Sequence, residues 1–291
     1  MSLTQEIIDQ VKEIPLLSTV ATRLLSLLSK RNYSVRDIVR LIESDSALTV
    51  KVLRVANSAA YARGGSITSL NRAIMHIGEM MVVSIAIGSY TDKLFDNSLE
   101  GYDGVEGDLW NHSLHTAIAA RKISEYSTNN ISGDLAFTSG LLHDIGKSTL
   151  SAFLKGRNEK ILIEYLSSGQ DEFVKAEDNI LGTNHAEVGS AIALHWGLPE
   201  SLIQVIKNHH SPADSVEQYK HLVYSVHLGD AISMMGGSGT GIDTLAYKID
   251  PEYTSYIEID EQSFARVLFE AQEEYLVAKS ASLNSGGSDE N

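Results

Sequence analysis

The sequence contains no cysteine, which excludes a disulfide framework, a zinc ribbon and a cysteine nucleophile and fits a reducing compartment. Proline is scarce, with four residues in 291, so few positions interrupt a regular helix. Positive charge is in deficit, because 23 lysines and arginines face 38 aspartates and glutamates, giving a formal net charge of −15. Since like charges repel, this balance argues against nonspecific binding to nucleic acid and to anionic membranes.

Long hydrophobic runs are missing as well. The longest uncharged apolar run lies near residues 80–88, far short of the roughly 20 residues that a membrane-spanning helix needs. The first residues lack the basic flank and the continuous apolar core of a signal peptide. These two absences predict a cytoplasmic protein. The chain is long enough for one or two domains, and 43% of its residues are apolar.

Apolar residues recur at helical spacing over nearly the whole chain, which predicts an all-α fold. Residues 35–42 form one such stripe, with Ser34 as its N-cap and Asp37 three residues on. The run near residues 80–88 is apolar on nearly all sides and indicates a buried helix, with a strand as the weaker alternative. One helix is expected to start near Asp134 and to carry His143 and Asp144. Further helices are expected over residues 47–56, 69–76, 108–126, 160–167, 173–181, 185–196, 200–209, 220–235 and 262–278.

Asparagine, glycine and aspartate cluster over residues 97–107, and we place a domain boundary there. The predicted organisation is an N-terminal helical subdomain over 1–100, a helical bundle over 105–235, a loop and helix packing on that bundle over 236–278, and a disordered tail over 279–291. The glycine-rich residues 236–241 follow a helix and lack the Gly-Lys-Ser/Thr ending of a P-loop. We interpret them as a flexible loop.

His143 and Asp144 stand side by side among apolar residues. Burying such polar groups is costly unless something compensates them, and a metal ion would do so. Other histidines and aspartates lie on separate predicted helices that can point into one bundle core. Asp108 and His112 lie one helical turn apart, and His115 shares their face, so the choice between His112 and His115 stays open. In chain order the candidate metal ligands are Asp108, His112, His143, Asp144, His185, His209, His210 and Asp230.

Each candidate alone also has a purely structural explanation. Asp108 can be a helix N-cap, and His209 with His210 can form the polar end of a helix. A single histidine in a helical protein is more often a core or surface residue than a ligand. That assignment is given to His76, His195, His221 and His227. Solvated helix faces are the interpretation for the basic residues near the N-terminus, which are Lys12, Arg23, Lys30, Arg31, Arg36 and Arg40.

The segment from His112 to Asp230 resembles an HD-superfamily domain, the fold of many metal-dependent phosphohydrolases. His143-Asp144-Ile145-Gly146-Lys147 resembles the defining doublet with its trailing lysine, and His112-Ser113 with Ala117 resembles the first-ligand helix. The remaining candidates resemble ligands of the HD-GYP branch, with Asp108 in the carboxylate position before the first histidine, followed by His185, His209, His210 and Asp230.

The N-terminal half resembles the HDOD (HD-related output domain) family, which implies an all-helical protein in bacterial signal transduction. The resemblance rests on Ile14-Pro15-Leu16-Leu17, residues 42–49, 53–61 and 73–78, Trp110, Trp196-Gly197-Leu198-Pro199 and the pair His209-His210. Many members of that family have lost the metal residues, whereas this chain keeps them. The glutamate and the Asp-Gly-x-Gly-Tyr-Pro loop of cyclic di-GMP hydrolases are missing after His210.

Two functions follow from this resemblance. The first is a regulatory protein with a protein partner in its pathway, or with a nucleotide or cyclic dinucleotide ligand, whose metal site serves structure, sensing or weak catalysis. The second is a metal-dependent phosphohydrolase of such nucleotides, in which Asp144 bridges two ions and Lys147 neutralises a phosphate oxygen. The site would hold one or two divalent transition-metal ions, iron or manganese in preference to zinc or nickel. Neither a membrane nor a nucleic acid is expected as a partner.

Overall fold

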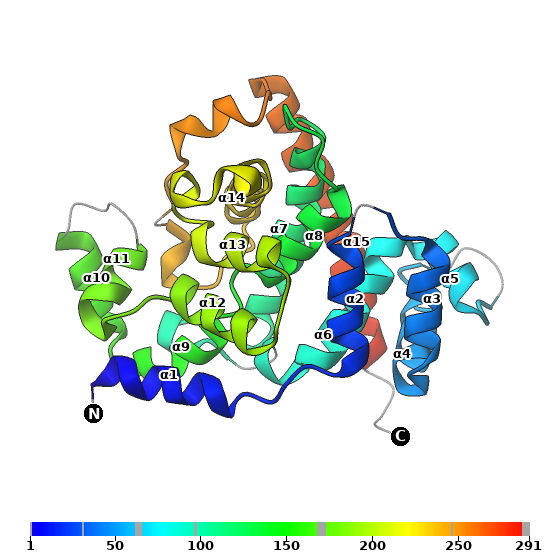
Figure 1. Ribbon diagram of the computed structural model, residues 1–291, viewed down its shortest axis with the longest axis horizontal. Helices are drawn as coiled ribbons and strands as arrows, with labels where there is room; N and C mark the ends of the chain where they lie inside the picture. The colour runs from blue at the N-terminus through cyan, green and yellow to red at the C-terminus, as the bar shows by residue number, and fades with distance from the viewer. Residues whose placement is uncertain are drawn as a thin grey trace.

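The structure of the protein is a computed structural model that describes residues 2–30, 32–61, 66–95, 98–167, 173–245 and 247–286. These residues form helices joined by loops and contain no strand, only the isolated bridge between Ser127 and Ile257, which confirms the all-α prediction (Figure 1). The helices are α1 (Leu3–Glu13), α2 (Thr19–Leu28), α3 (Val35–Glu43), α4 (Ser46–Ala56), α5 (Leu70–Ile77), α6 (Glu79–Phe95), α7 (Asp108–Ser124), α8 (Gly133–Leu142), α9 (Lys147–Leu154), α10 (Asn158–Ser167), α11 (Phe173–Leu181), α12 (His185–His195), α13 (Glu200–Asn208), α14 (Lys220–Met235) and α15 (Glu261–Gly286). Short 3₁₀ turns lie at Glu100–Tyr102, Pro212–Asp214, Glu217–Tyr219, Ile242–Leu245 and Pro251–Ser255.

Local sequence signals set several helix ends. The backbone N–H and the hydroxyl of Ser34 both donate to Asp37 and so fix the start of α3. Gly78 caps the C-terminal end of α5, and its φ of 85° lies in the region that favours glycine. The apolar run near residues 80–88 lies in α6, so the helix prediction is confirmed and the strand alternative is wrong. Among the described helices none alone is long and apolar enough to cross a membrane, although α5 and the first part of α6, bent by 114°, meet that test together.

Helix α7 is the centre of the bundle, and it packs against α8 on one side and α14 on the other. Glycines stand where the helices cross. A Cβ atom on Gly140 would lie 2.8 Å from the Cα atom of Ala117, and one on Gly229 would lie 2.7 Å from the backbone nitrogen of Ala120. The backbones therefore approach too closely for any larger residue, and this approach draws the polar side chains of the three helices together.

The crossing of α7 and α14 provides a stability test. We expect Gly229→Ala to lower the free energy of unfolding by about 3 kcal/mol, because the new methyl group must push backbone atoms apart. Gly133→Ala at the start of α8 is the control, since its methyl group would meet side-chain atoms of Arg121 and Ser124. Chemical denaturation of both variants measures the difference. Equal stability of the two variants would contradict the close crossing.

The first helix packs against elements far from it in sequence. Figure 1 shows α1 lying along α12 and α9, in agreement with their contacts. The segment after α1 is held by two hydrogen bonds, since His195 Nε2 donates to the carbonyl of Ile14 at 3.0 Å and Trp196 Nε1 donates to that of Pro15 at 3.1 Å. One hydrophobic core includes residues on both sides of the boundary placed at residues 97–107, which stays a prediction.

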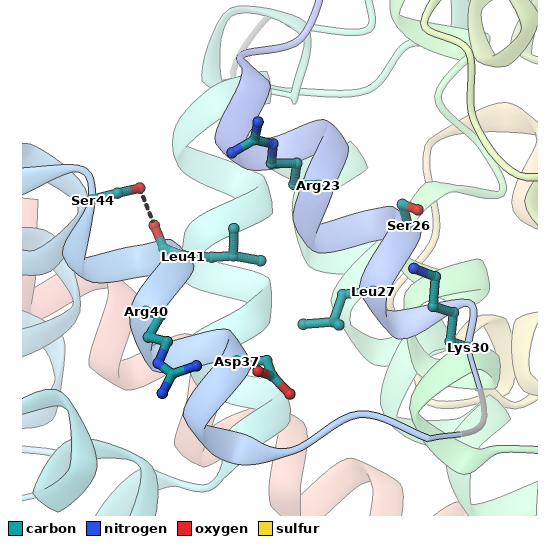
Figure 2. A pocket seen from close by; sticks show the side chains of 8 residues that line it. All are labelled: Arg23, Ser26, Leu27, Lys30, Asp37, Arg40, Leu41 and Ser44. Atoms are coloured by element: carbon teal, nitrogen blue, oxygen red, sulfur yellow. Dashed lines mark hydrogen bonds between the residues drawn. The ribbon is translucent and has the colours of Figure 1, made fainter.

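Helices α2 and α3 pack side by side in the N-terminal half, and an open groove lies between them (Figure 2). Helix α15 packs on α7 and α4 and continues beyond its predicted end. The prediction of a disordered tail is wrong for residues 279–286, because the helix runs to Gly286 and buries Ala278 and Ala281, three residues apart on one face. Residues 287–291 lie outside the described residues.

Candidate metal centre

His143 and Asp144 lie in a turn rather than within a helix, which corrects the prediction. Helix α8 ends at Leu142 and α9 begins at Lys147. The turn presses Gly146 against the start of α12, where a Cβ atom would lie 1.9 Å from the carbonyl oxygen of His185. Only glycine allows this approach, which sets Asp144 beside His185, the first residue of α12.

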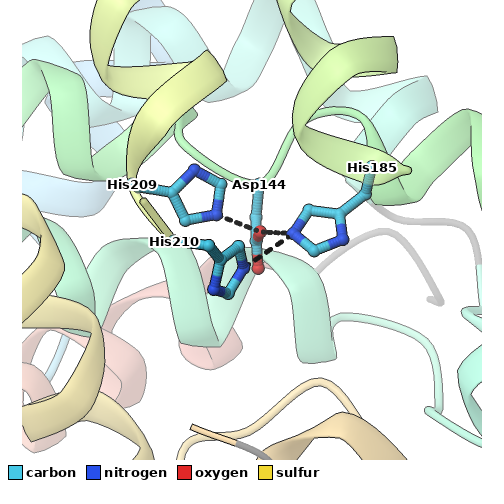
Figure 3. A group of neighbouring side chains, drawn as sticks. All are labelled: Asp144, His185, His209 and His210. Atoms are coloured by element: carbon cyan, nitrogen blue, oxygen red, sulfur yellow. Dashed lines mark hydrogen bonds and ion pairs between the residues drawn. The ribbon is translucent and has the colours of Figure 1, made fainter. Parts of the chain in front are cut away.

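Seven of the predicted ligands converge in one space inside the bundle. Asp144 lies within reach of the imidazoles of His185, His209 and His210, which come from the start of α12 and the end of α13 (Figure 3). Two further groups, His112 with His143 and Asp144, and His143 with His209 and Asp230, overlap with the first. Six of the seven residues are at most 1% exposed, and His210 is half-buried. Solvent therefore contributes little to compensating these polar groups.

The carboxylate of Asp144 faces two sets of imidazoles. Its Oδ1 atom lies 3.3 Å from Nε2 of His185 and 3.5 Å from Nε2 of His209. Its Oδ2 atom lies 3.3 Å from Nε2 of His112 and 3.5 Å from Nε2 of His143. One residue thus offers a separate oxygen to each set.

The second carboxylate and the ring nitrogens crowd the same space. Oδ1 of Asp230 lies 3.1 Å from Nε2 of His112 and 3.8 Å from Nε2 of His143. Nε2 of His112 lies 3.2 Å from Nε2 of His143, and Nε2 of His185 lies 2.9 Å from Nε2 of His210. Two facing nitrogens of this kind attract only if a proton or a metal ion lies between them.

The other ring nitrogen of four histidines fixes their tautomer. In each ring Nδ1 lies 2.6–2.9 Å from an oxygen that can only accept, so Nδ1 carries the hydrogen and the neutral ring has its lone pair on Nε2. Such outward hydrogen bonds are typical of histidines that bind metals. The pairs are His112 with the Ser238 carbonyl, His143 with the Gly140 carbonyl, His185 with Glu177 and His209 with the Ile206 carbonyl.

The inward-facing atoms fit a transition-metal ion. Asp144 Oδ1, Asp230 Oδ1 and His209 Nε2 are buried, and none of them has a hydrogen-bond partner within the described part of the chain. Two ligands about 2.1 Å from one ion at right angles lie roughly 3 Å apart, close to the separations found in this cluster. Imidazole nitrogen together with carboxylate oxygen is a donor set that iron, manganese, zinc and nickel accept.

Opposite charges in the cluster stabilise the charged forms of Asp144 and His112. Burial favours the neutral acids, but the charges of Lys147 and His143 hold the pKa of Asp144 well below its usual range. Burial also opposes a charge on His112, yet Asp144 and Asp230 raise its pKa to about 10. At His209 burial prevails and lowers the pKa to about 4.

Lys147 is buried and bound to the protein's own carboxylates. Its Nζ atom lies 2.6 Å from Oδ2 of Asp144, 2.5 Å from Oδ2 of Asp243 and 2.9 Å from the hydroxyl of Thr240. Burial opposes the charge, but the two carboxylates outweigh it and raise the pKa of Lys147. A phosphate oxygen at this lysine would have to replace Asp243.

The interpretation of residues 236–241 as a flexible loop is wrong. Thr240 is fully buried, and the carbonyl of Ser238 accepts the hydrogen bond from His112. A Cβ atom on Gly241 would lie 1.9 Å from the carbonyl oxygen of Tyr102, so glycine is needed here for close packing. The loop closes one side of the cluster and orients one of its imidazoles.

Glu177 is a site residue that the sequence reasoning missed. Its Oε2 atom accepts from the backbone N–H and from Nδ1 of His185, at 2.9 and 2.8 Å, and its Oε1 atom accepts from the Tyr102 hydroxyl at 2.5 Å. The signal was present, because α11 buries Phe173, Ala176 and Leu181, and Glu177 is the charged member of that stripe. A fully buried carboxylate on an apolar helix face requires partners of this kind.

We expect Glu177→Gln to weaken metal binding by a factor of about 10 to 100, because it loosens the hold on the His185 ring. Asp178→Asn is the control, since that neighbouring carboxylate accepts from Asn184. Competition with a metal-binding dye measures both affinities. The role of Glu177 is refuted if the two variants bind metal equally well.

Two predicted candidates lie apart from the cluster. Asp108 is the first residue of α7 and accepts from the backbone N–H of Val105 at 2.8 Å, and no group of described residues that could hold a metal includes it. The ring of His115 stacks on Tyr275 at a centroid distance of 4.6 Å, and Nδ1 contacts the hydroxyl of Ser238. Burial lowers the pKa of His115 to about 4. The structure thus places His112, and not His115, against the carboxylates.

His195 and His227, two of the four histidines to which a structural role was assigned, make hydrogen bonds that hold the fold. Nδ1 of His227 donates to the carbonyl of His209 at 2.7 Å, and His195 holds the segment after α1 as described above. His76 contacts the carbonyl of Tyr61, and His221 contacts the hydroxyl of Thr128. Across the described ranges, no candidate metal group includes any of the four.

The fold is shared with several solved structures. An HDOD domain protein of unknown function from Geobacter sulfurreducens is 22% identical with a TM-score of 0.64, covering 99% of this chain and 96% of that one. A candidate signal transduction protein from Marinobacter aquaeolei VT8 is 21% identical with a TM-score of 0.72, covering 94% and 60%. A candidate phosphohydrolase from Shewanella amazonensis SB2B is 20% identical with a TM-score of 0.65, covering 94% and 97%. At these identities the likeness concerns the fold.

An uncharacterized protein from Treponema pallidum (strain Nichols) is 25% identical over 231 residues, which are 77% of this chain. The chain spans 43% of the length of that relative. A family model for the HDOD domain matches residues 14–212, well over half of the sequence and including six of the seven clustered residues. Together with the helical fold, this match shows that the protein belongs to the HDOD domain family.

Proposed function

We propose that the protein is a bacterial signal-transduction protein whose helical bundle holds one or two divalent transition-metal ions, iron or manganese in preference to zinc or nickel. One observation carries the proposal. Imidazole lone pairs, fixed by outward hydrogen bonds from Nδ1, face buried carboxylate oxygens that have no hydrogen-bond partner among the described residues. A cation compensates this arrangement better than any neutral filling.

The ligands divide into two sets that share Asp144. His112, His143, Asp144 and Asp230 would hold one ion, and His185, His209 and His210 would hold the second. A pair of such ions, when bound, lowers the pKa of a water molecule and clamps phosphoryl oxygens. The chain's own contribution is orientation, because Glu177 and the Ser238 carbonyl keep the Nδ1 hydrogens of His185 and His112 directed outward.

The regulatory role is favoured over turnover by the state of Lys147. Its ammonium group is in contact with Asp144 and Asp243, and a substrate phosphate would have to displace one of these carboxylates. The chain also continues after His210 into the short turn Pro212–Asp214, without the acidic and glycine-rich loop of the cyclic di-GMP hydrolases. The metal would then support the fold or sense a ligand, while a partner protein receives the signal.

The alternative is a phosphohydrolase acting on a nucleotide or a cyclic dinucleotide. The geometry of Asp144 favours it, because the two oxygens of one carboxylate face two imidazole sets, as a bridge between two ions requires. In that case Asp144 and Lys147 would be the catalytic residues. Lys147 would exchange Asp243 for a substrate oxygen.

Elemental analysis and a turnover assay test the proposal together. Protein purified without chelator should contain at least one transition-metal ion per chain. Hydrolysis of p-nitrophenyl phosphate, nucleotides and cyclic dinucleotides should be no faster for the unaltered protein than for Asp144→Asn. A rate that Asp144→Asn abolishes would favour the hydrolase instead. Metal-free protein, still metal-free after incubation with iron or manganese, would refute both functions.

A further inference from the structure

Three basic residues line one groove between the consecutive helices α2 and α3. Figure 2 shows Arg23 and Lys30 on the α2 side and Arg40 on the α3 side. Leu27 and Leu41 point toward each other across the groove, which has a volume of about 450 Å³. The groove therefore combines an aliphatic floor with cationic edges, at a distance from the metal cluster.

The three cations form no ion pair within the described part of the chain. Each of them is exposed, and the ion pairs of the described residues include none of the three. Lys12, another basic residue of this half, behaves differently and pairs with Asp9 at 2.7 Å. Asp37 also lies in the groove. Hydrogen bonds from the hydroxyl and the backbone N–H of Ser34 hold the pKa of its carboxyl below the usual range, and the charge of Arg40 adds to this effect.

The three cations form a local positive group in a protein of negative net charge. Acidic residues outnumber basic ones by 38 to 23, so most of the surface repels an anionic partner. Screening limits that repulsion to about 8 Å at physiological salt, and a local group of cations then decides where an anion binds. The groove thus provides selectivity as well as attraction, since an acidic partner is rejected on other faces.

The residues that line the groove limit the class of ligand that it can bind. Neither an aromatic side chain nor a glycine belongs to the lining, so no aromatic ring stacks on a nucleotide base and no glycine-rich loop cradles a phosphate with backbone N–H groups. The groove is open along two helices and does not enclose a small molecule. Spaced carboxylates beside an apolar anchor match its cations and its two leucines. A helix in a groove is a common form of such recognition.

We propose that this groove binds an acidic helical segment of a partner protein, with a leucine-type anchor between Leu27 and Leu41 and carboxylates at Arg23, Lys30 and Arg40. Guanidinium groups bind carboxylates through pairs of hydrogen bonds, so the contact is directional as well as electrostatic. The site lies in the N-terminal half and needs no metal. It goes beyond the proposed function, and its failure would leave the metal centre untouched.

Fluorescence anisotropy with the full-length protein tests the proposal. The probe is a short labelled helical peptide with a leucine stripe flanked by glutamates, and the control probe carries glutamines instead. We expect the Arg23→Gln, Lys30→Gln, Arg40→Gln triple variant to bind the acidic peptide at least tenfold more weakly than the unaltered protein. A control triple variant, Arg36→Gln, Arg54→Gln, Arg72→Gln, removes the same charge from exposed positions outside the groove lining and should bind almost normally.

The remaining outcomes separate this proposal from its rivals. Binding should weaken as salt rises to about 0.5 M, and treatment with chelator should leave it unchanged. Equal binding of the two triple variants, equal binding of the two peptides, or no binding at about 100 μM peptide would each overturn it. Displacement of the peptide by inorganic pyrophosphate, at matched ionic strength, would identify a phosphate site instead and would also overturn it.

Discussion

The Asp144→Asn variant is expected to bind metal at least 100-fold more weakly than the unaltered protein. Loss of a residue that merely orients a ligand weakens binding by about 10 to 100-fold, and Asp144 offers one oxygen to each imidazole set. An asparagine keeps the shape but offers a neutral oxygen and an amide nitrogen, and the nitrogen cannot serve as a ligand. Elemental analysis after gel filtration and a dye competition measure the loss.

Asp134→Asn is the matched control for this substitution. Asp134 lies in the first turn of α8, at the opposite end of that helix from the doublet, and accepts from the hydroxyl of Tyr33. The control variant should keep its metal, and circular dichroism should show both variants folded. A folded Asp144→Asn protein with unaltered metal content would exclude the shared-carboxylate arrangement.

Removal of the metal is expected to lower the melting temperature by about 10 °C. An ion at 1,000 times its dissociation constant stabilises the folded state by about 4 kcal/mol, and one kcal/mol shifts the melting temperature of a chain of this size by roughly 2–4 °C. Without the ion, buried lone pairs face one another and buried oxygens lose their partner. Calorimetry of the protein before and after dialysis against a chelator measures the shift.

Metal added back distinguishes this mechanism from a general effect of the chelator. Manganese or iron should restore the melting temperature, while magnesium should not, because it prefers oxygen ligands and keeps its water molecules. Asp144→Asn should show little response to the chelator. If neither the chelator nor the added metal changes the melting temperature, the cluster holds no ion.

The helical spacing of apolar residues and the capping residues at helix ends are strong enough signals to predict much of this fold. Residues 220–235 were predicted as a helix and form α14 with the same ends, and the Ser34 capping signal marks the start of α3. Local sequence signals do not predict a helix end that is set by tertiary packing. The turn at residues 143–146 follows from the contact of Gly146 with the start of α12, which no spacing rule reveals.

The ligands were easier to predict than their surroundings. Histidines and aspartates on separate helices are conspicuous, and seven of the eight candidates meet in one space. Their supporting groups are not conspicuous, since the Ser238 carbonyl could belong to any residue and Asp243 lies in the predicted loop before the last helix. Glu177 was within reach of the sequence, because a charged residue on an otherwise apolar stripe indicates a buried partner.

Because α1 packs on α12, the apolar face of α1 lacks this partner until α12 has been synthesised. The hydrogen bond from His195 to Ile14 joins residues 181 positions apart, and translation proceeds at about 5–20 residues per second. The apolar face of α1, with Ile7 and Val11, therefore emerges from the ribosome roughly 10–40 s before its docking surface is made. Throughout that interval the nascent chain presents an amphipathic helix whose apolar face lacks the surface that later covers it.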